Sequence, residues 1–191
     1  MKLINIINNH TTEGATPQFY LKADTALLRN NDAFYIPDGV GRVVASPHIV
    51  LKVSRLAKCI GERFAPRCID GIMGGVTFTA ADKLDAARHK GLPWDEAVGF
   101  DHSSALSLDT LARDAMLQGA TFYINGEERA RLSIGDMRFT PDSVVAHLSE
   151  CMTLRIGDLI FLGSPAEFDV KAGDNYRLTI GDHTLLNFDI K

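Results

Sequence analysis

Short apolar runs, some continuous and some alternating with polar residues, dominate the chain and predict more strands than helices. The runs that are bounded by turn-forming residues cover residues 1–7, 19–22, 34–37, 43–45, 48–53 and 71–81. The run HIVLKV is rich in β-branched residues, and GIMGGVTFTAA mixes such residues with glycine, which suits a strand that another backbone approaches closely. The polar stretch 8–17 after the first run predicts a loop.

Two tight hairpins are predicted in the second half of the chain. ATFYI is followed by Asn125 and Gly126 and then by EERARL. Asn and Gly tolerate the positive φ angles of a two-residue hairpin turn, so this is the strongest local signal in the sequence. NYRLTI and HTLLNFDI, separated by Gly181 and Asp182, predict a second hairpin, and DLIFLG predicts a strand before it.

Three helices are expected among these strands. The first begins at Asp82 and ends at Gly91, and the second covers residues 107–118, where apolar residues recur at helical spacing. The third opens with Thr140 as cap and Pro141 as first residue. Strands outnumber helices, and the chain shows neither internal repeats nor a linker. We therefore predict a single β-rich α+β domain over residues 1–191.

Composition narrows the class of protein. The chain has 46% hydrophobic and 23% charged residues, as globular proteins do. Its formal charge of -4, without a cluster of Lys and Arg, argues against nucleic-acid binding. No apolar run approaches the roughly 20 residues of a membrane helix, and the N-terminus lacks the layout of a signal peptide. We expect no membrane partner and a cytoplasmic location.

The cysteines do not indicate a disulfide framework. Cys59, Cys68 and Cys151 are odd in number and have unrelated spacings. Such a set predicts neither a disulfide scaffold nor a zinc site built from cysteine pairs. We interpret all three as ordinary thiols, either in the core or near the surface.

A series of short motifs follows in a fixed order. These motifs are GLPW (91–94), GFD (99–101), INGEE (124–128), GDM (135–137), LRIGDLIFLGSP (154–165) and AGD (172–174). Together they resemble the fumarylacetoacetate hydrolase family, and most of all its small acylpyruvase and oxaloacetate decarboxylase branch. The resemblance covers nearly the whole chain, and it identifies the chain as a divergent member.

This resemblance implies a fold, an assembly and a chemistry. The fold is a mixed β-roll with a few short helices, usually in a homodimer. The family holds Mg or Mn in a pocket on top of the sheets, where the ion binds the oxygens of a 2-oxo acid. A hard divalent cation prefers carboxylate oxygens, and as a Lewis acid it stabilises a developing enolate while a C–C bond is broken.

The family's metal-ligating carboxylates are missing at the matching positions. The first two ligands are Glu residues separated by one residue at the start of a buried strand, and they correspond to Ser46 and His48. The third, an Asp, corresponds to Thr77. The formal charge facing an ion therefore falls from minus three to about zero, and each lost carboxylate removes an attraction on the order of several kcal/mol. We expect no Mg or Mn cofactor.

Other family features are also replaced. Ala81 stands in place of an Arg, Leu84 in place of a glutamine, and Val98 in place of a Lys that would help to hold the substrate. The branch's lid, a helix that carries a His and a Glu after the first strand, corresponds here to the short segment TTEGAT. We therefore expect the lid to be missing.

Several remaining side chains are candidates for a pocket. Lys22 matches a family Lys near the pocket and could meet an anionic ligand, although a surface Lys is about as plausible an interpretation. Ser164, in the glycine turn, could donate a hydrogen bond to a bound acid, or could serve the turn alone. Thr77 is a further candidate, and His48 could hold a softer ion such as Zn, but a hydrogen-bonded filler His is the simpler interpretation.

Two further residues have competing interpretations. His102 lies between Asp101 and Ser103, which suggests a nucleophile and its base. Adjacent residues of an extended segment point to opposite faces, so we do not expect a catalytic triad there. Asp82 is interpreted as a helix-capping residue.

Two hypotheses for function remain. The first is a protein that has lost the metal-dependent activity and acts as a binding or structural homodimer, with a small anionic 2-oxo acid as its ligand. The second is an active hydrolase, decarboxylase or isomerase of 2-oxo acids with an altered metal site. The simultaneous loss of three carboxylates, the Lys and the lid favours the first.

Overall fold

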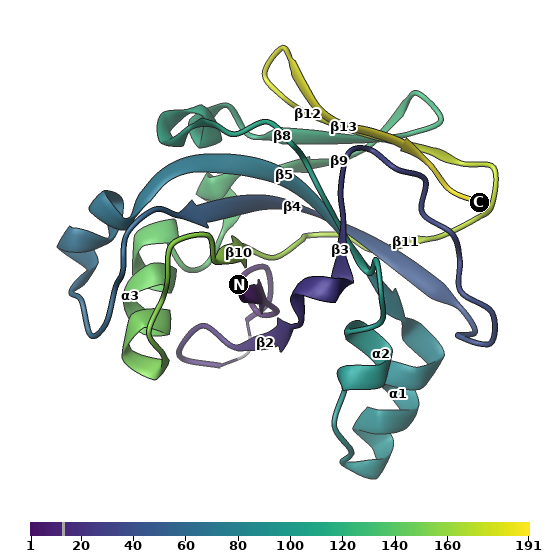
Figure 1. Ribbon diagram of the computed structural model, residues 1–191, viewed down its shortest axis with the longest axis horizontal. Helices are drawn as coiled ribbons and strands as arrows, with labels where there is room; N and C mark the ends of the chain where they lie inside the picture. Colours follow the sequence, from purple (N-terminus) through teal and green to yellow (C-terminus); the bar gives the residue numbers. More distant parts are fainter. Residues whose placement is uncertain (13) are drawn as a thin grey trace.

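The computed structural model describes residues 1–12 and 14–191. Among these residues, two sheets lie one above the other, with the smaller sheet covering one face of the larger (Figure 1). The larger sheet contains β1 (Leu3–Ile6), β2 (Phe19–Lys22), β3 (Leu27–Leu28), β4 (Val43–Val53), β5 (Ile69–Ala80), β6 (Ser104–Leu106), β7 (Leu111–Ala112), β10 (Leu159–Phe161) and β11 (Phe168–Asp169). The smaller contains β8 (Ala120–Ile124), β9 (Glu127–Leu132), β12 (Asn175–Ile180) and β13 (His183–Asp189).

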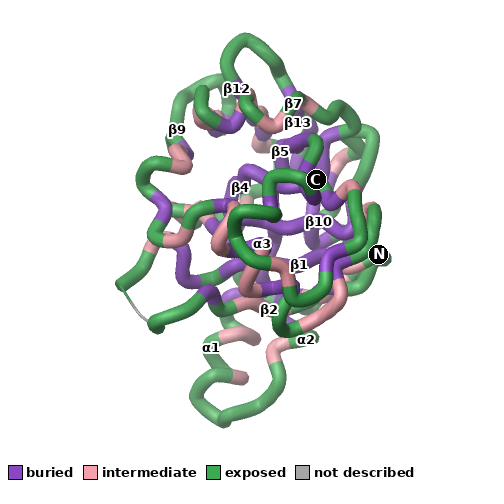
Figure 2. Tube along the Cα trace, turned by 90° about the vertical axis from the view of Figure 1, so that its left-hand side faces the viewer, coloured by how far each residue is buried: buried purple, intermediate pink, exposed green. Residues whose placement is uncertain are grey.

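Helical segments are short and lie outside the sheets. They are α1 (Ala81–Lys90), α2 (Asp95–Val98), α3 (Pro141–Cys151) and the 3-10 segments η1 (Asp24–Ala26), η2 (Glu62–Cys68), η3 (Arg113–Gln118) and η4 (Ile134–Asp136). α1 projects from the body of the molecule and is mostly exposed, whereas the strands of the larger sheet are mostly buried (Figure 2). This is the β-rich α+β architecture that the sequence predicted, and no described helix is long and apolar enough to cross a membrane.

The larger sheet is curled so that its two edges approach each other. Its strand order is β2-β1-β10-β4-β5-β6-β3, which places β2 at one edge and β3 at the other. β2 ends at Lys22 and β3 begins at Leu27, so five residue steps, at most about 18 Å of chain, separate the two edges. The backbone N–H of His102 also donates to the Thr25 carbonyl over 3.3 Å. The sheet is therefore a roll with an inner face.

Alternation along β4 and, from Gly71 onward, along β5 divides the residues between two faces. The apolar residues at odd positions of β4 and at even positions of this part of β5 face the smaller sheet and belong to the main hydrophobic core. Even positions of β4 and odd positions of this part of β5 face the inside of the roll, where Val50, Met73 and Phe161 belong to a second apolar cluster. Because the side-chain period of a strand is two, the sequence alone fixes which residues share the inner face once one of them is placed.

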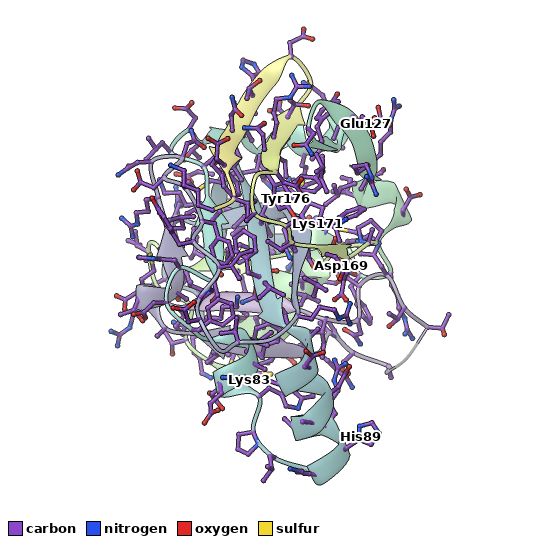
Figure 3. The ribbon with its side chains drawn as sticks, turned by 90° about the vertical axis from the view of Figure 1, so that its right-hand side faces the viewer. Lys83, His89, Glu127, Asp169, Lys171 and Tyr176 are labelled. Carbon is purple, nitrogen blue, oxygen red and sulfur yellow. The ribbon has the colours of Figure 1, made fainter. Side chains whose placement is uncertain are left out.

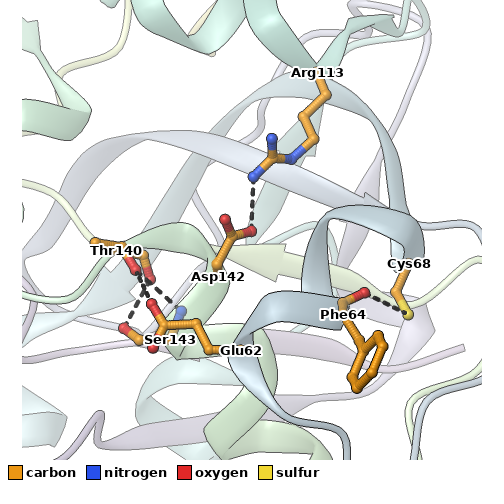
Figure 4. Close-up of polar contacts among 7 residues, drawn as sticks. All are labelled: Glu62, Phe64, Cys68, Arg113, Thr140, Asp142 and Ser143. Atoms are coloured by element: carbon orange, nitrogen blue, oxygen red, sulfur yellow. Dashed lines mark hydrogen bonds and ion pairs between the residues drawn. The ribbon is translucent and has the colours of Figure 1, made fainter.

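The elements with strong local signals are confirmed. Asn125 and Gly126 have φ angles of 53° and 83° and join β8 to β9. β12 and β13 form the second hairpin. α3 begins after Thr140, whose Oγ1 accepts a hydrogen bond from the Ser143 backbone N–H over 3.1 Å (Figure 4). Gly91 ends α1 in the left-handed conformation.

Three local expectations are wrong. Residues 107–118 do not form an α-helix, because Leu111 pairs with Ile72 of β5 and only η3 follows. Of the strand expected at residues 34–37, only an isolated bridge between Phe34 and Ile190 is present. The predicted strands 43–45 and 48–53 are one continuous strand, β4. In the first and third cases the structure is decided by pairing with β5. A pattern of neighbouring residues does not contain this information.

Asp82 is also not the cap of α1. The N-cap position is Ala80, without a capping side chain, and Asp82 lies in the first turn. Its Oδ2 instead accepts a hydrogen bond from the Arg42 backbone N–H over 3.0 Å, which ties α1 to the segment before β4. All three cysteines are free thiols; Cys68 is buried, and Cys59 and Cys151 are exposed.

Candidate functional site

A small polar cavity lies on the inner face of the roll and gathers most of the residues that the sequence singled out. Its volume is about 90 Å³. The residues that line it come from β1, β2, β4, β5, α1 and the loops around α2 and after β10: Asn5, Ile6, Ile7, Tyr20, Ser46, His48, Thr77, Thr79, Leu84, Arg88, Trp94, Val98, Ser164 and Glu167. A cavity of this size holds several waters or a small organic acid.

Strand register explains why the three residues that the resemblance matches to metal ligands meet. Ser46 of β4 pairs directly with Thr77 of β5, and His48 lies two residues further along β4, on the same face. All three side chains are buried. The His48 Nε2 and the Thr77 Oγ1 are 2.9 Å apart and hydrogen-bonded. Two of the three residues that the resemblance matches to metal ligands therefore bond to each other.

His48 is held in its neutral form. Burial and, to a smaller extent, the positive charge of Lys22 lower its pKa to about 3, although a backbone hydrogen bond at Gly163 acts in the opposite direction. The ring Nδ1 is buried and has no well-aligned hydrogen-bond partner. A neutral imidazole with one ring nitrogen engaged by Thr77 adds no charge to the cavity.

Lys22 is buried rather than exposed at the surface, and it is not among the residues that line the cavity. Its side chain lies on the same strand face as Tyr20, two residues away, which lines the cavity. The Lys22 Nζ donates to the Ser103 carbonyl over 2.7 Å, and it lies 3.2 Å from the Ser103 Oγ and 3.4 Å from the Phe78 carbonyl. None of these partners is a carboxylate, and burial lowers the pKa of Lys22 to about 7. Lys22 thus closes the roll with an amine that is only partly charged at neutral pH.

The mouth of the cavity carries one charge of each sign. The Arg88 guanidinium lies 5.0 Å from the centre of the Trp94 ring, a cation–π contact. Glu167 is the one carboxylate among the lining residues that the structure describes. Burial raises the pKa of Tyr20, and the negative charge of Glu167 raises it further, so this phenol stays protonated. The cavity therefore offers hydroxyl groups and no concentration of negative charge.

Other predicted residues lie elsewhere or are engaged locally. His102 is exposed, with a φ of 61°, and does not line the cavity. The buried Ser103 donates its hydroxyl to the Val98 carbonyl over 3.0 Å, so no triad forms with Asp101 and His102. The Ser164 hydroxyl donates to the Ala166 carbonyl over 2.8 Å, although Ser164 does line the cavity. Ala81 is buried at the start of α1 outside the lining.

The segment in which the resemblance places the family's lid lies between β1 and β2. Between β1 and β2, residues 7–12 and 14–18 form turns and bends without a helix, and Glu13 lies outside the described residues. A larger groove, of about 480 Å³, lies along α1 and α2 away from the cavity. Figure 3 shows Lys83, which lines this groove, and His89 on the projecting α1. The groove includes none of the sequence-predicted site residues.

The residues of the cavity do not fit Mg or Mn. Ser46, His48 and Thr77 bring no negative charge. The His48 Nε2 and the Thr77 Oγ1, two atoms that could ligate a metal, are already hydrogen-bonded to each other. Among residues 1–12 and 14–191, no group of three or more His, Cys, Asp or Glu side chains is placed to hold a metal ion. The same finding gives the Zn alternative at His48 no support, because zinc needs three or four such ligands.

Six polar or aromatic residues of the lining were not predicted as site residues. These are Asn5, Tyr20, Thr79, Arg88, Trp94 and Glu167. Asn5, Tyr20 and Thr79 share the inner face with Ser46 by strand alternation, so that periodicity could have found them. Arg88 and Glu167 arrive through tertiary packing, for which the sequence carries no local signal.

The comparisons with known proteins agree with this geometry at the level of the fold. Residues 5–190 match the family described as fumarylacetoacetate (FAA) hydrolase C-terminal. Oxaloacetate tautomerase YcgM of Escherichia coli is 25% identical over 174 residues, which are 88% of this chain and 80% of that protein. The mitochondrial oxaloacetate tautomerase FAHD1 of Arabidopsis thaliana is 26% identical over 179 residues, 92% of this chain and 80% of that protein.

Solved structures show the same fold at lower identity. A putative fumarylacetoacetate hydrolase family protein from Yersinia pestis superposes with a TM-score of 0.92 at 23% identity, covering 100% of this chain and 93% of that chain. Fumarylpyruvate hydrolase from Pseudomonas aeruginosa, solved with Mn2+ and pyruvate, superposes with a TM-score of 0.90 at 20% identity. This match covers 100% of this chain and 89% of that chain.

Proposed function

Because the chain belongs to the fumarylacetoacetate hydrolase family, we propose that it binds a small 2-oxo acid in the β4–β5 cavity without a metal ion. In this proposal it has lost the family's metal-dependent cleavage of C–C bonds. The observation that carries the proposal is the neutral set of Ser46, His48 and Thr77 at the positions that the resemblance matches to the metal ligands, with His48 and Thr77 hydrogen-bonded to each other. A Lewis acid cannot be anchored there by charge.

The remaining side chains support the binding of a small anion. The hydroxyl groups of Ser46 and Thr79 border the cavity and can donate to a carboxylate. The buried Lys22 and Arg88 at the mouth of the cavity supply positive charge, against the single carboxylate of Glu167. The small volume restricts the ligand to a few heavy atoms, as in pyruvate.

Calorimetry of protein treated with EDTA tests the binding step. We expect pyruvate to bind in EDTA, and Ser46→Leu, which fills the cavity, to abolish binding. Ser54→Leu, just beyond the end of β4, is the matched control and should bind as the unchanged protein does. Retained binding by Ser46→Leu would place the ligand elsewhere.

Turnover measurements test the loss of activity. We expect no consumption of acetylpyruvate or oxaloacetate that depends on added Mn2+. Saturable, Mn2+-dependent turnover would contradict the proposal and favour the altered metal site. A variant with Glu at positions 46 and 48, Asp at 77 and Lys at 98 restores the family's groups, and it should gain metal binding if the cavity keeps its shape.

A second candidate is an isomerase that needs only proton transfer. Two observations favour it: curated relatives are oxaloacetate tautomerases, and the buried Lys22 has a pKa of about 7, which suits a general base or acid at neutral pH. Keto–enol interconversion moves a proton and breaks no C–C bond. Conversion of enol oxaloacetate in EDTA, lost in Lys22→Met, would favour this function over simple binding.

We also propose the homodimer that the family resemblance implies. Sedimentation equilibrium should give about twice the mass of one chain. A mass equal to one chain, 20.9 kDa, would contradict it.

A further inference from the structure

Two of the buried polar atoms without hydrogen-bond partners belong to residues that line the cavity. Within the described part of the chain, the side-chain atoms that are buried without a hydrogen bond are Asn5 Oδ1, His10 Nε2, His48 Nδ1, Ser104 Oγ and Tyr176 OH. Asn5 and His48 line the cavity, and Ser104 pairs in the sheet with Thr77, which also lines it. Unpaired buried polar atoms are costly and rare, so those of the two lining residues, Asn5 and His48, indicate hydrogen bonds that a ligand completes.

Asn5 defines what kind of hydrogen bond is missing. The side chain is 1% exposed, and its Nδ2 donates to the Leu3 carbonyl over 3.4 Å. This contact orients the amide, because an amide oxygen facing the Leu3 carbonyl would be repelled. The Oδ1 is therefore the unpaired atom, and an amide oxygen only accepts hydrogen bonds.

His48 accommodates either kind of partner. Its Nε2 is bonded to the Thr77 hydroxyl, which can donate or accept. In one arrangement the unpaired Nδ1 carries the proton and donates; in the other it accepts. Asn5 is thus the group that discriminates between ligands, whereas His48 adapts to them.

We propose that the cavity selects a small acid that carries a hydroxyl group beside its carboxylate, as in a 2-hydroxy acid or an enol, over the corresponding keto acid. The ligand hydroxyl donates its proton to the Asn5 Oδ1. A keto oxygen offers only lone pairs, so Asn5 would stay unpaired. This inference rests on the proposed function and deepens it, since it concerns the same cavity. Sites built to bond a hydroxyl reject analogues without one by large factors.

Calorimetric titration with D-lactate, L-lactate and pyruvate in EDTA tests the inference. We expect one lactate enantiomer to bind about tenfold or more tightly than pyruvate. Equal binding of pyruvate and both lactates would overturn the inference and leave the proposed function standing. If none of the three acids binds, the proposed function fails and the inference fails with it.

Variants of Asn5 separate a ligand contact from a structural role. Asn5→Leu removes the acceptor at similar volume, so it should abolish the preference for lactate and raise the melting temperature. Asn5→Thr keeps a hydroxyl acceptor and should retain part of the preference. Asn187→Leu, exposed on β13 and outside the lining of the cavity, is the control for ligand preference, which it should not change. A preference that survives in Asn5→Leu contradicts the role of Asn5.

Discussion

The two faces of the β4–β5 ladder bury similar numbers of side chains in different ways. Towards the smaller sheet the face is apolar and closely packed, with Phe78 stacked on Phe34 at a centroid distance of 3.7 Å. Towards the inside of the roll, His48 and the neighbouring hydroxyl groups surround a cavity, and buried atoms lack partners. The first face supplies stability, and the second gives up some stability for a site that can bind a ligand.

The largest expected effect concerns the packed face. Phe78→Ala removes a fully buried ring from the stack with Phe34, and it should lower the free energy of unfolding by about 3–5 kcal/mol. Urea denaturation measures the change. Calorimetry on the folded fraction should show unaltered ligand affinity, because the ring lies on the opposite side of β5 from the cavity. A loss below about 1 kcal/mol would contradict the distinction between the faces.

Replacing a buried polar group that makes all its hydrogen bonds should change stability in the opposite direction to replacing Asn5, whose buried Oδ1 has no hydrogen-bond partner. Asp158 is 1% exposed, forms an ion pair with the Lys2 Nζ, and accepts from the backbone N–H groups of Lys2 and Arg155 over 2.8 Å each. Asp158→Asn should therefore cost about 2–3 kcal/mol in urea denaturation, whereas Asn5→Leu stabilises. Equal signs for the two substitutions would contradict the comparison.

Acid titration offers a second measurement on Asp158. Burial raises the pKa of this carboxyl, but the Lys2 ammonium and the two backbone N–H groups outweigh burial, so the pKa is lowered from 3.8. A lowered carboxyl pKa gives stability that is present above the unfolded-state pKa and lost as the pH falls through the folded-state value. The variant Asp158→Asn should lack this part of the acid destabilisation.

Lys22 on the inner face predicts a different dependence on pH. Its pKa is about 7 in the folded chain against 10.5 in the unfolded chain, so between these values the unfolded state binds more protons. The free energy of unfolding should therefore rise with pH across this window, by at most about 1.4 kcal/mol per pH unit. Lys22→Met should flatten the rise in urea denaturation, and an unchanged slope would assign it to other groups.

The smallest effect is expected at the cap of α3, which packs against the apolar face through Val144, Val145 and Leu148. Thr140→Ala removes the hydrogen bond to the Ser143 N–H and should cost about 1 kcal/mol in thermal or urea denaturation. Ligand affinity should not change. Altered affinity would show that the two faces are coupled.

The sequence predicted elements whose signals are local. Asn125 and Gly126 set the first hairpin, and Thr140 with Pro141 set the start of α3, because these residues act through their own backbone geometry. The segment 107–118 has helical spacing, yet Leu111 joins the sheet beside Ile72. A non-local strand pairing overrode the local pattern there.

The candidate site was also predictable only in part, because some of its features depend on non-local packing. Ser46, His48 and Thr77 came from the family resemblance, and strand alternation places them on one face. The burial of Lys22 could not be predicted, because it depends on the two edges of the roll meeting at Ser103. The unpaired Asn5 Oδ1 likewise follows from the orientation of one amide and from the position of the cavity beside it.

Binding of Mn2+, followed by electron paramagnetic resonance of the free ion, tests the central claim most directly. The claim is that the cavity residues do not hold the family's divalent cation. We predict no saturable uptake of Mn2+ by the unchanged chain, with or without pyruvate, and uptake of one ion per chain by a variant carrying Ser46→Glu, His48→Glu and Thr77→Asp. Saturable uptake of one Mn2+ by the unchanged chain, abolished by Ser46→Leu, would contradict the claim.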